Sequence, residues 1–138
     1  MKDTELALLL DRFMRHIHFG LQAKADSFDT ARVGPGGGIV LLTLAEMGNP
    51  SMQDLTRRVA RDKSQMTRMI RSLEAKGLVE RKASPHDARV SLVCLTAEGE
   101  NVVAVFKNAV AETINEVLSP ISEDESRTMR TILKRALG

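Results

Sequence analysis

The most restrictive feature of the sequence is a change in the spacing of its apolar residues at Gly77. Before this glycine, residues 51–76 place apolar side chains at helical spacing in two short runs. After it, residues 78–82 and 89–95 alternate like strands and are joined by a polar turn. Gly77 itself is typical of the residue that follows a helix C-terminus. The pattern therefore predicts two short helices followed at once by a β-hairpin.

Longer periodic runs predict helices on both sides of this unit. Apolar residues repeat at helical spacing over 4–24 and 97–118, and residues 39–47 form a shorter apolar run. Four candidate N-cap residues precede expected helices: Ser51, Asp62, Thr96 and Ser122. Two helices joined by a short turn and followed by a hairpin make a winged helix-turn-helix. We therefore expect a mainly α fold of the α+β winged-helix type, with about six helices and a small β-hairpin wing.

A glycine-rich stretch at residues 34–38 interrupts the chain before Ile39. It resembles a phosphate-binding loop in glycine content alone, because no Gly-Lys-Ser/Thr follows it. We expect a linker or a helix start here.

Charge is distributed unevenly along the 138 residues, although the net charge is only +2. Residues 56–89 contain ten basic and four acidic side chains, a net charge of +6, whereas the rest of the chain carries −4. This split indicates a polyanionic partner for the middle of the chain, and a solvated basic face with no partner is the alternative. With one cysteine, an acidic N-terminus and no long apolar run, we expect a cytoplasmic protein without disulfides or membrane partner.

Residues 62–99 resemble the MarR family of winged-helix transcriptional regulators. The resemblance lies in the stretch Leu73-Glu74-Ala75-Lys76-Gly77-Leu78-Val79-Glu80-Arg81, in Asp87-Ala88-Arg89, and in Leu95-Thr96-Ala97-Glu98-Gly99. It implies an obligate homodimer in which residues 1–33 and 97–138 supply dimerisation helices and residues 34–96 form the DNA-binding domain. It also implies a pseudo-palindromic operator in double-stranded DNA. The glycine stretch departs from the family, which usually has an ordinary helix start there.

The second helix of the helix-turn-helix is expected to enter the major groove with its N-terminal part. Its apolar stripe predicts which side chains face away from the core, namely Lys63, Ser64, Gln65, Thr67, Arg68 and Arg71. We expect Gln65 and Arg68 to contact bases, because Gln pairs with adenine and Arg with guanine. The others are expected to make phosphate or mixed contacts, and a solvated polar side chain is the alternative for each.

The wing supplies the strongest single-residue prediction. The resemblance implies that Arg89 enters the minor groove and that Asp87 holds its orientation, and narrow minor grooves attract arginine. The two residues are two apart, so their side chains share a face of an extended chain. The alternative is an exposed ion pair worth under about 1 kcal/mol. Arg81 and Lys82 are expected to assist on the DNA backbone.

The sequence says less about which small molecule or other signal would control such a regulator. The resemblance implies a small-molecule effector, because many members of that family bind small aromatic anions, and Arg15, His16 and Phe19 are candidates for the effector pocket. Cys94 lies in an apolar strand and is expected to be a buried hydrophobe, with redox sensing as the alternative. No spacing of Cys, His or Asp predicts a metal, and we expect no cofactor.

No nucleophile elbow, phosphate loop or metal pair is present, so an enzyme is not expected. We expect a transcriptional regulator, with repression as the favoured outcome, although operator position decides between repressor and activator. The competing hypothesis is a winged helix used only for protein–protein contact.

Overall fold

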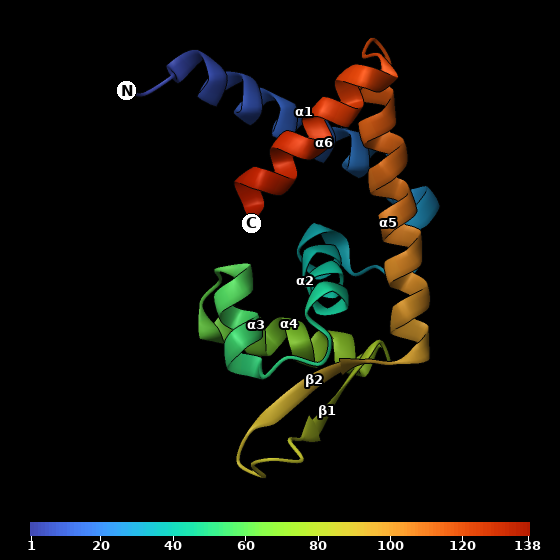
Figure 1. The fold of residues 1–138 in the computed structure, drawn as a ribbon. Helices are drawn as coiled ribbons and strands as arrows, with labels where there is room; N and C mark the ends of the chain where they lie inside the picture. Colours follow the sequence, from blue (N-terminus) through green and yellow to red (C-terminus); the bar gives the residue numbers. More distant parts are fainter. The chain divides into compact units, whose positions relative to one another are not determined.

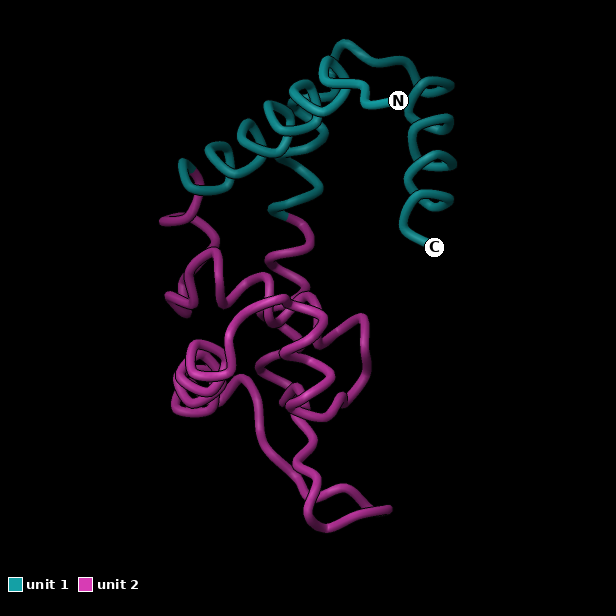
Figure 2. The backbone as a smooth tube through the Cα atoms, turned by 90° about the vertical axis from the view of Figure 1, so that its left-hand side faces the viewer, with its two compact units in different colours: residues 1–23, 109–138 teal, residues 24–108 magenta.

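The computed structural model describes all 138 residues and contains six helices and one two-stranded sheet (Figure 1). The elements in chain order are α1 (Thr4–Phe28), α2 (Gly34–Met47), α3 (Met52–Val59), α4 (Lys63–Ala75), β1 (Val79–Ala83), β2 (Ser91–Leu95), α5 (Ala97–Val117) and α6 (Glu123–Leu137). The winged-helix fold predicted from the sequence is confirmed. The chain divides into two compact units, residues 24–108 and residues 1–23 with 109–138 (Figure 2). Both α1 and α5 run from one unit into the other.

The predicted caps begin the helices at four places. The Ser51 hydroxyl accepts from the Asp54 N–H at 3.1 Å, and the Asp62 carboxylate accepts from the Gln65 N–H at 2.8 Å. At α5 the Thr96 hydroxyl accepts from the Gly99 N–H at 3.0 Å. At α6, Ser122 and Glu125 form a reciprocal capping box. Each cap satisfies an N–H group that the first turn of a helix leaves without a partner.

The unit of residues 24–108 has one apolar core beneath α4. The buried side chains come from α2, α3, α4, the hairpin and the first half of α5, and they include Val40, Leu41, Leu44, Leu55, Met66, Ile70, Leu73, Leu78, Val93 and Val103. Three of these lie on one stripe of α4, so this helix turns the opposite stripe to solvent.

The hairpin pairs Val79 with Leu95 at its base and Ala83 with Ser91 toward its tip. It projects from the helices of its unit (Figures 1 and 2). Its base is anchored by buried Val79 and Val93, and the Val93 N–H donates to the Pro50 carbonyl at 2.8 Å. The tip is therefore the exposed end of a ribbon that is fixed at its root.

A close packing of α5 against the start of β1 accounts for the glycine at position 99. The Thr96 hydroxyl donates to the Gly77 carbonyl at 2.6 Å, and the Thr96 N–H donates to the Leu78 carbonyl at 3.1 Å. A Cβ on Gly99 would lie 2.0 Å from the Leu78 carbonyl oxygen. Only glycine fits this seam without a backbone shift.

The glycine stretch forms the first turn of α2, so the helix begins five residues before Ile39. The Asp29 carboxylate accepts from the Val33 and Gly34 N–H groups, both at 2.9 Å, and thereby caps a helix start that offers no capping side chain of its own. Within the turn, a Cβ on Gly38 would lie 2.5 Å from the ring of Phe106. The stretch therefore serves close helix packing.

The unit of residues 1–23 and 109–138 leaves many large apolar side chains exposed. Neither α1 nor α6 contains a buried residue. The exposed large side chains are Leu6, Leu8, Leu9, Leu10, Met14 and Phe19 of α1, and Ile132, Leu133 and Leu137 of α6. No helix in the structure has both the length and the hydropathy to cross a membrane.

Candidate nucleic-acid interface

The exposed stripe of α4 carries the polar residues predicted for the major groove. Lys63, Ser64, Gln65, Arg68 and Arg71 are all exposed. Thr67 is half-buried, and its hydroxyl donates to the Lys63 carbonyl at 2.8 Å. That bond uses the Thr67 proton, so Thr67 offers only acceptor lone pairs and its methyl group to a neighbour.

Packing of the apolar stripe of α4 in the core fixes the direction in which its exposed stripe faces. Met66 and Ile70 are fully buried, and Asp62 caps the helix immediately before Lys63. No ion pair involves Lys63, Arg68 or Arg71 among the salt bridges of the structure. Three cations on one face are thus available to a polyanion.

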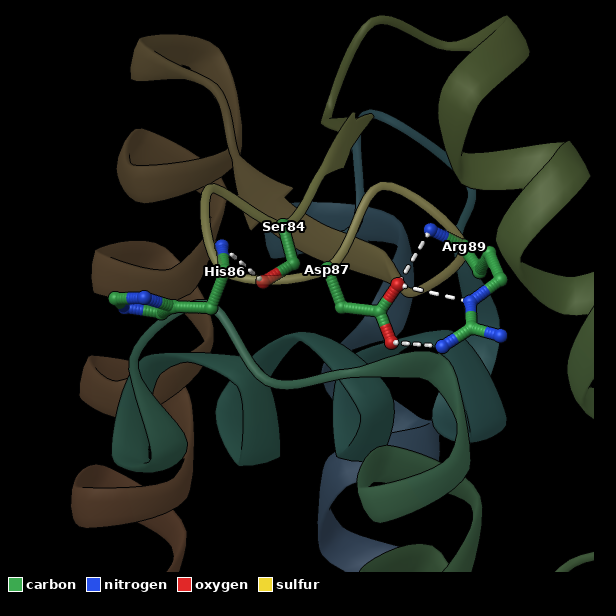
Figure 3. Close-up of polar contacts among 4 residues, drawn as sticks. All are labelled: Ser84, His86, Asp87 and Arg89. Carbon is green, nitrogen blue, oxygen red and sulfur yellow. Dashed lines mark hydrogen bonds and ion pairs between the residues drawn. The ribbon is translucent and has the colours of Figure 1, made fainter.

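At the wing tip, the Asp87 carboxylate accepts three hydrogen bonds from Arg89 (Figure 3). Asp87 Oδ1 accepts from the Arg89 backbone N–H at 3.0 Å and from Nε at 3.1 Å, while Oδ2 accepts from Nη2 at 3.4 Å. The side-chain bond from Arg89, followed by the backbone bond, lowers the pKa of Asp87 below its ordinary value. The carboxylate therefore stays ionised and orients the guanidinium.

The turn beneath this pair is also fixed. The Val90 N–H donates to the Asp87 carbonyl at 3.0 Å, the Ser84 N–H donates to the Val90 carbonyl at 2.9 Å, and the His86 N–H donates to the Ser84 hydroxyl at 3.2 Å. The Arg89 side chain is 91% exposed on this ordered turn. An exposed and oriented cation at the tip of a projecting hairpin carries the charge that a narrow minor groove attracts.

The two other predicted wing residues are both paired within the chain. Arg81 Nε lies 3.2 Å from Glu74 Oε1 of α4, and Lys82 Nζ lies 3.1 Å from Glu80 Oε1 of the same strand. The bond and charge of Glu80 raise the pKa of Lys82, so this exposed amine stays protonated. The structure thus brings Arg81 to α4 and leaves Lys82 on the exposed side of the hairpin.

Lys76 belongs to the stretch that resembles the family, and the structure gives it a contact that the sequence did not predict. Its Nζ donates to the Ala31 carbonyl at 3.0 Å and also to the Arg32 carbonyl. These partners lie more than forty residues away in the chain. No local pattern could have indicated them.

The candidate effector residues all lie exposed on α1. Arg15 forms an ion pair with Asp11 at 3.0 Å, His16 Nδ1 bonds the Arg12 carbonyl at 2.9 Å, and Phe19 is 65% exposed. A groove of about 480 Å³ lies elsewhere, between α2 and α5, and is lined by other residues. Cys94 is buried, and no three His, Cys, Asp or Glu side chains gather in a way that could hold a metal ion.

Comparison with known proteins places this geometry among transcriptional regulators. The model of the MarR family matches residues 39–91. The chain is 29% identical over 135 residues to the HTH-type transcriptional regulator MhqR of Bacillus subtilis, covering 97% of this chain and 90% of that protein. It is 34% identical over 85 residues to the uncharacterized HTH-type transcriptional regulator YdgJ of Bacillus subtilis, and this match covers only 52% of the relative.

The solved structure of wild-type MarR from E. coli in its apo form has a similar fold. Its TM-score is 0.80 at 25% identity, over 96% of both chains. The transcriptional regulator PA3341 aligns with a TM-score of 0.76 at 26% identity, over 96% of this chain and 95% of that one.

Proposed function

The chain belongs to the MarR family of transcriptional regulators, and from this premise we propose that it is a homodimeric, sequence-specific repressor. The observation that carries the proposal is the wing tip, where Asp87 orients a guanidinium that is 91% exposed. A solvent-exposed ion pair contributes little to stability. The Asp87–Arg89 pair is therefore better explained by binding of a partner than by stabilisation of the fold. The partner with matching charge is a phosphate-lined groove of DNA.

In this proposal α4 reads the major groove and the wing reads the adjacent minor groove. Gln65 and Arg68 contact base edges, since Gln and Arg can each bond a base with two donor or acceptor atoms. Lys63, Ser64, Thr67 and Arg71 contact phosphates or the groove edge, and Lys82 adds a phosphate contact from the wing. Base contacts then set sequence preference, while the phosphate contacts set affinity and register.

The exposed apolar side chains of α1 and α6 support a homodimer. Exposed large apolar side chains on α1 and α6 favour burial against a second copy. Two copies present two α4 helices and two wings, so the operator should be a pseudo-palindrome. A Leu9→Asp variant should shift the protein to a monomer in sedimentation equilibrium and weaken DNA binding, because each monomer holds one half-site.

We also propose that a small aromatic or anionic effector releases the DNA and that Arg15, His16 and Phe19 contribute to its site. Arg15 offers charge and Phe19 an exposed ring for stacking. An Arg15→Ala variant should keep operator binding and lose the response to the effector.

The direct test is selection of bound duplexes from a random-sequence pool with the purified protein. The proposal expects enrichment of a two-fold-symmetric sequence and an affinity for it at least about 10³ times that for unselected DNA. Failure to enrich any sequence would favour the competing hypothesis, a winged helix that contacts only other proteins.

A further inference from the structure

The ion pair between Glu74 and Arg81 is the feature that links the two parts of the interface. It joins the last turn of α4 to β1, with Nε and Oε1 3.2 Å apart. Its two side chains are only 33% and 36% exposed, whereas those of the neighbouring pair Lys82–Glu80 are 61% and 50% exposed. Partial burial lowers the screening by water and salt, so this pair is the stronger of the two.

The position of Arg81 in the hairpin lets the ion pair control where the hairpin tip lies. The hairpin is anchored at its base by buried Val79 and Val93, and Arg81 lies opposite Val93, at the end of the anchored part that is nearer the tip. Ser84 at the tip is three residues further on, about 10 Å along a strand. A tilt of the hairpin by about 10° would therefore move its tip by about 2 Å. This displacement exceeds the positional error that a set of binding side chains tolerates.

We propose that Glu74 and Arg81 are positioning residues, which fix the angle of the wing to α4 so that Arg89 and the α4 side chains meet adjacent grooves together. This inference rests on the proposed DNA-binding function. It differs from the expectation that Arg81 assists on the DNA backbone, because Arg81 Nε already lies 3.2 Å from Glu74 Oε1.

The two roles of Arg81 make opposite predictions for Glu74→Gln. Removing an acid near DNA strengthens binding if charge alone acts, since the protein becomes more positive. If the pair positions the wing, removing the acid weakens operator binding. Glu80→Gln is the matched control, because it removes an equal charge from β1, the strand of Arg81, and breaks no contact with α4.

The experiment measures the affinity of the full chain for a selected operator and for unselected DNA by fluorescence anisotropy at several salt concentrations. Glu74→Gln and Arg81→Gln should each weaken operator binding about tenfold, or about 1.4 kcal/mol. The double variant should be no weaker than either single variant, because both remove the same interaction. Glu80→Gln should bind as tightly as the unaltered chain or slightly more tightly.

Two further readouts separate positioning from contact and from loss of folding. Binding to unselected DNA and the salt slope should stay unchanged, whereas a phosphate contact by Arg81 would lower the slope by about 2 for the two copies in a dimer. The exchanged pair, Glu74→Arg with Arg81→Glu, should recover most of the affinity while circular dichroism confirms a folded chain.

The proposal is overturned if Glu74→Gln binds the operator as tightly as the unaltered chain, if Arg81→Gln lowers the salt slope, or if a folded exchanged pair stays as weak as the single variants. Failure of the unaltered chain to prefer any sequence would instead contradict the proposed function itself.

Discussion

Replacing Gly99 by alanine should destabilise the protein even though alanine favours helices. Helix propensity alone predicts a gain of about 0.5–1 kcal/mol for this change in the first turn of α5. The new Cβ, however, would lie 2.0 Å from the Leu78 carbonyl oxygen and 3.2 Å from Leu95 Cδ2. Because the Leu78 oxygen is backbone, the start of α5 must move away from β1.

That movement strains the two hydrogen bonds from Thr96 to the Gly77 and Leu78 carbonyls. Their loss costs about 0.5–1.5 kcal/mol each, and overpacking adds about 1–3 kcal/mol. After the helix gain is subtracted, Gly99→Ala should lower the free energy of unfolding by about 3 kcal/mol.

Gly77→Ala is the matched control. Gly77 has a φ of +74° and open space where its Cβ would be, so the expected cost is only the left-handed conformation, about 1–2 kcal/mol. Urea unfolding should be followed by far-ultraviolet circular dichroism, since the chain has no Trp or Tyr, and at one fixed protein concentration. The close packing of Gly99 against the Leu78 carbonyl would be refuted as an explanation if the Gly99→Ala protein were as stable as the unaltered chain, or more stable than Gly77→Ala.

Three further predictions follow from the described contacts. Arg89→Ala should weaken operator binding by about 1–3 kcal/mol without changing the urea midpoint, and unchanged anisotropy titrations would contradict its role. Asp29→Ala removes the acceptor for the N–H groups of Val33 and Gly34 at the start of α2 and should cost about 1 kcal/mol of stability; an unaltered urea midpoint would show that the cap contributes nothing. Hydrogen bonds from the backbone and then the side chain of Ser122 lower the pKa of Glu125 below its ordinary 4.5, so its contribution is present above that pH and is lost as pH falls through the lowered value. The stability difference between the unaltered chain and Glu125→Ala should therefore shrink from pH 7 to pH 3, and a constant difference would count against the capping box.

Sequence reasoning succeeded where the determinants are local. The change of period at Gly77 predicted α4 and the hairpin, and the caps Ser51, Asp62 and Ser122 lie within three residues of the groups they bind. These features can be predicted without the tertiary structure because each depends on residues that are close together in the chain.

It was incomplete where the determinants are distant. The sequence predicts an apolar helix from Ile39, but α2 begins at Gly34 because Asp29 reaches forward to cap it. Likewise the bond from Lys76 to the Ala31 carbonyl spans 45 residues. A glycine run looks like a breaker until the tertiary partner that packs against it is known.

The salt dependence of DNA binding tests the central claim most directly. The three cations proposed to contact phosphates, Lys63, Arg71 and Lys82, would displace about six counterions from DNA when two copies bind. The slope of log affinity against log salt should therefore be about −5 to −7, with a selected symmetric operator bound more tightly than unselected DNA at every salt concentration. An affinity that stays flat from low to physiological salt would contradict a DNA-binding regulator and favour a winged helix that binds only proteins.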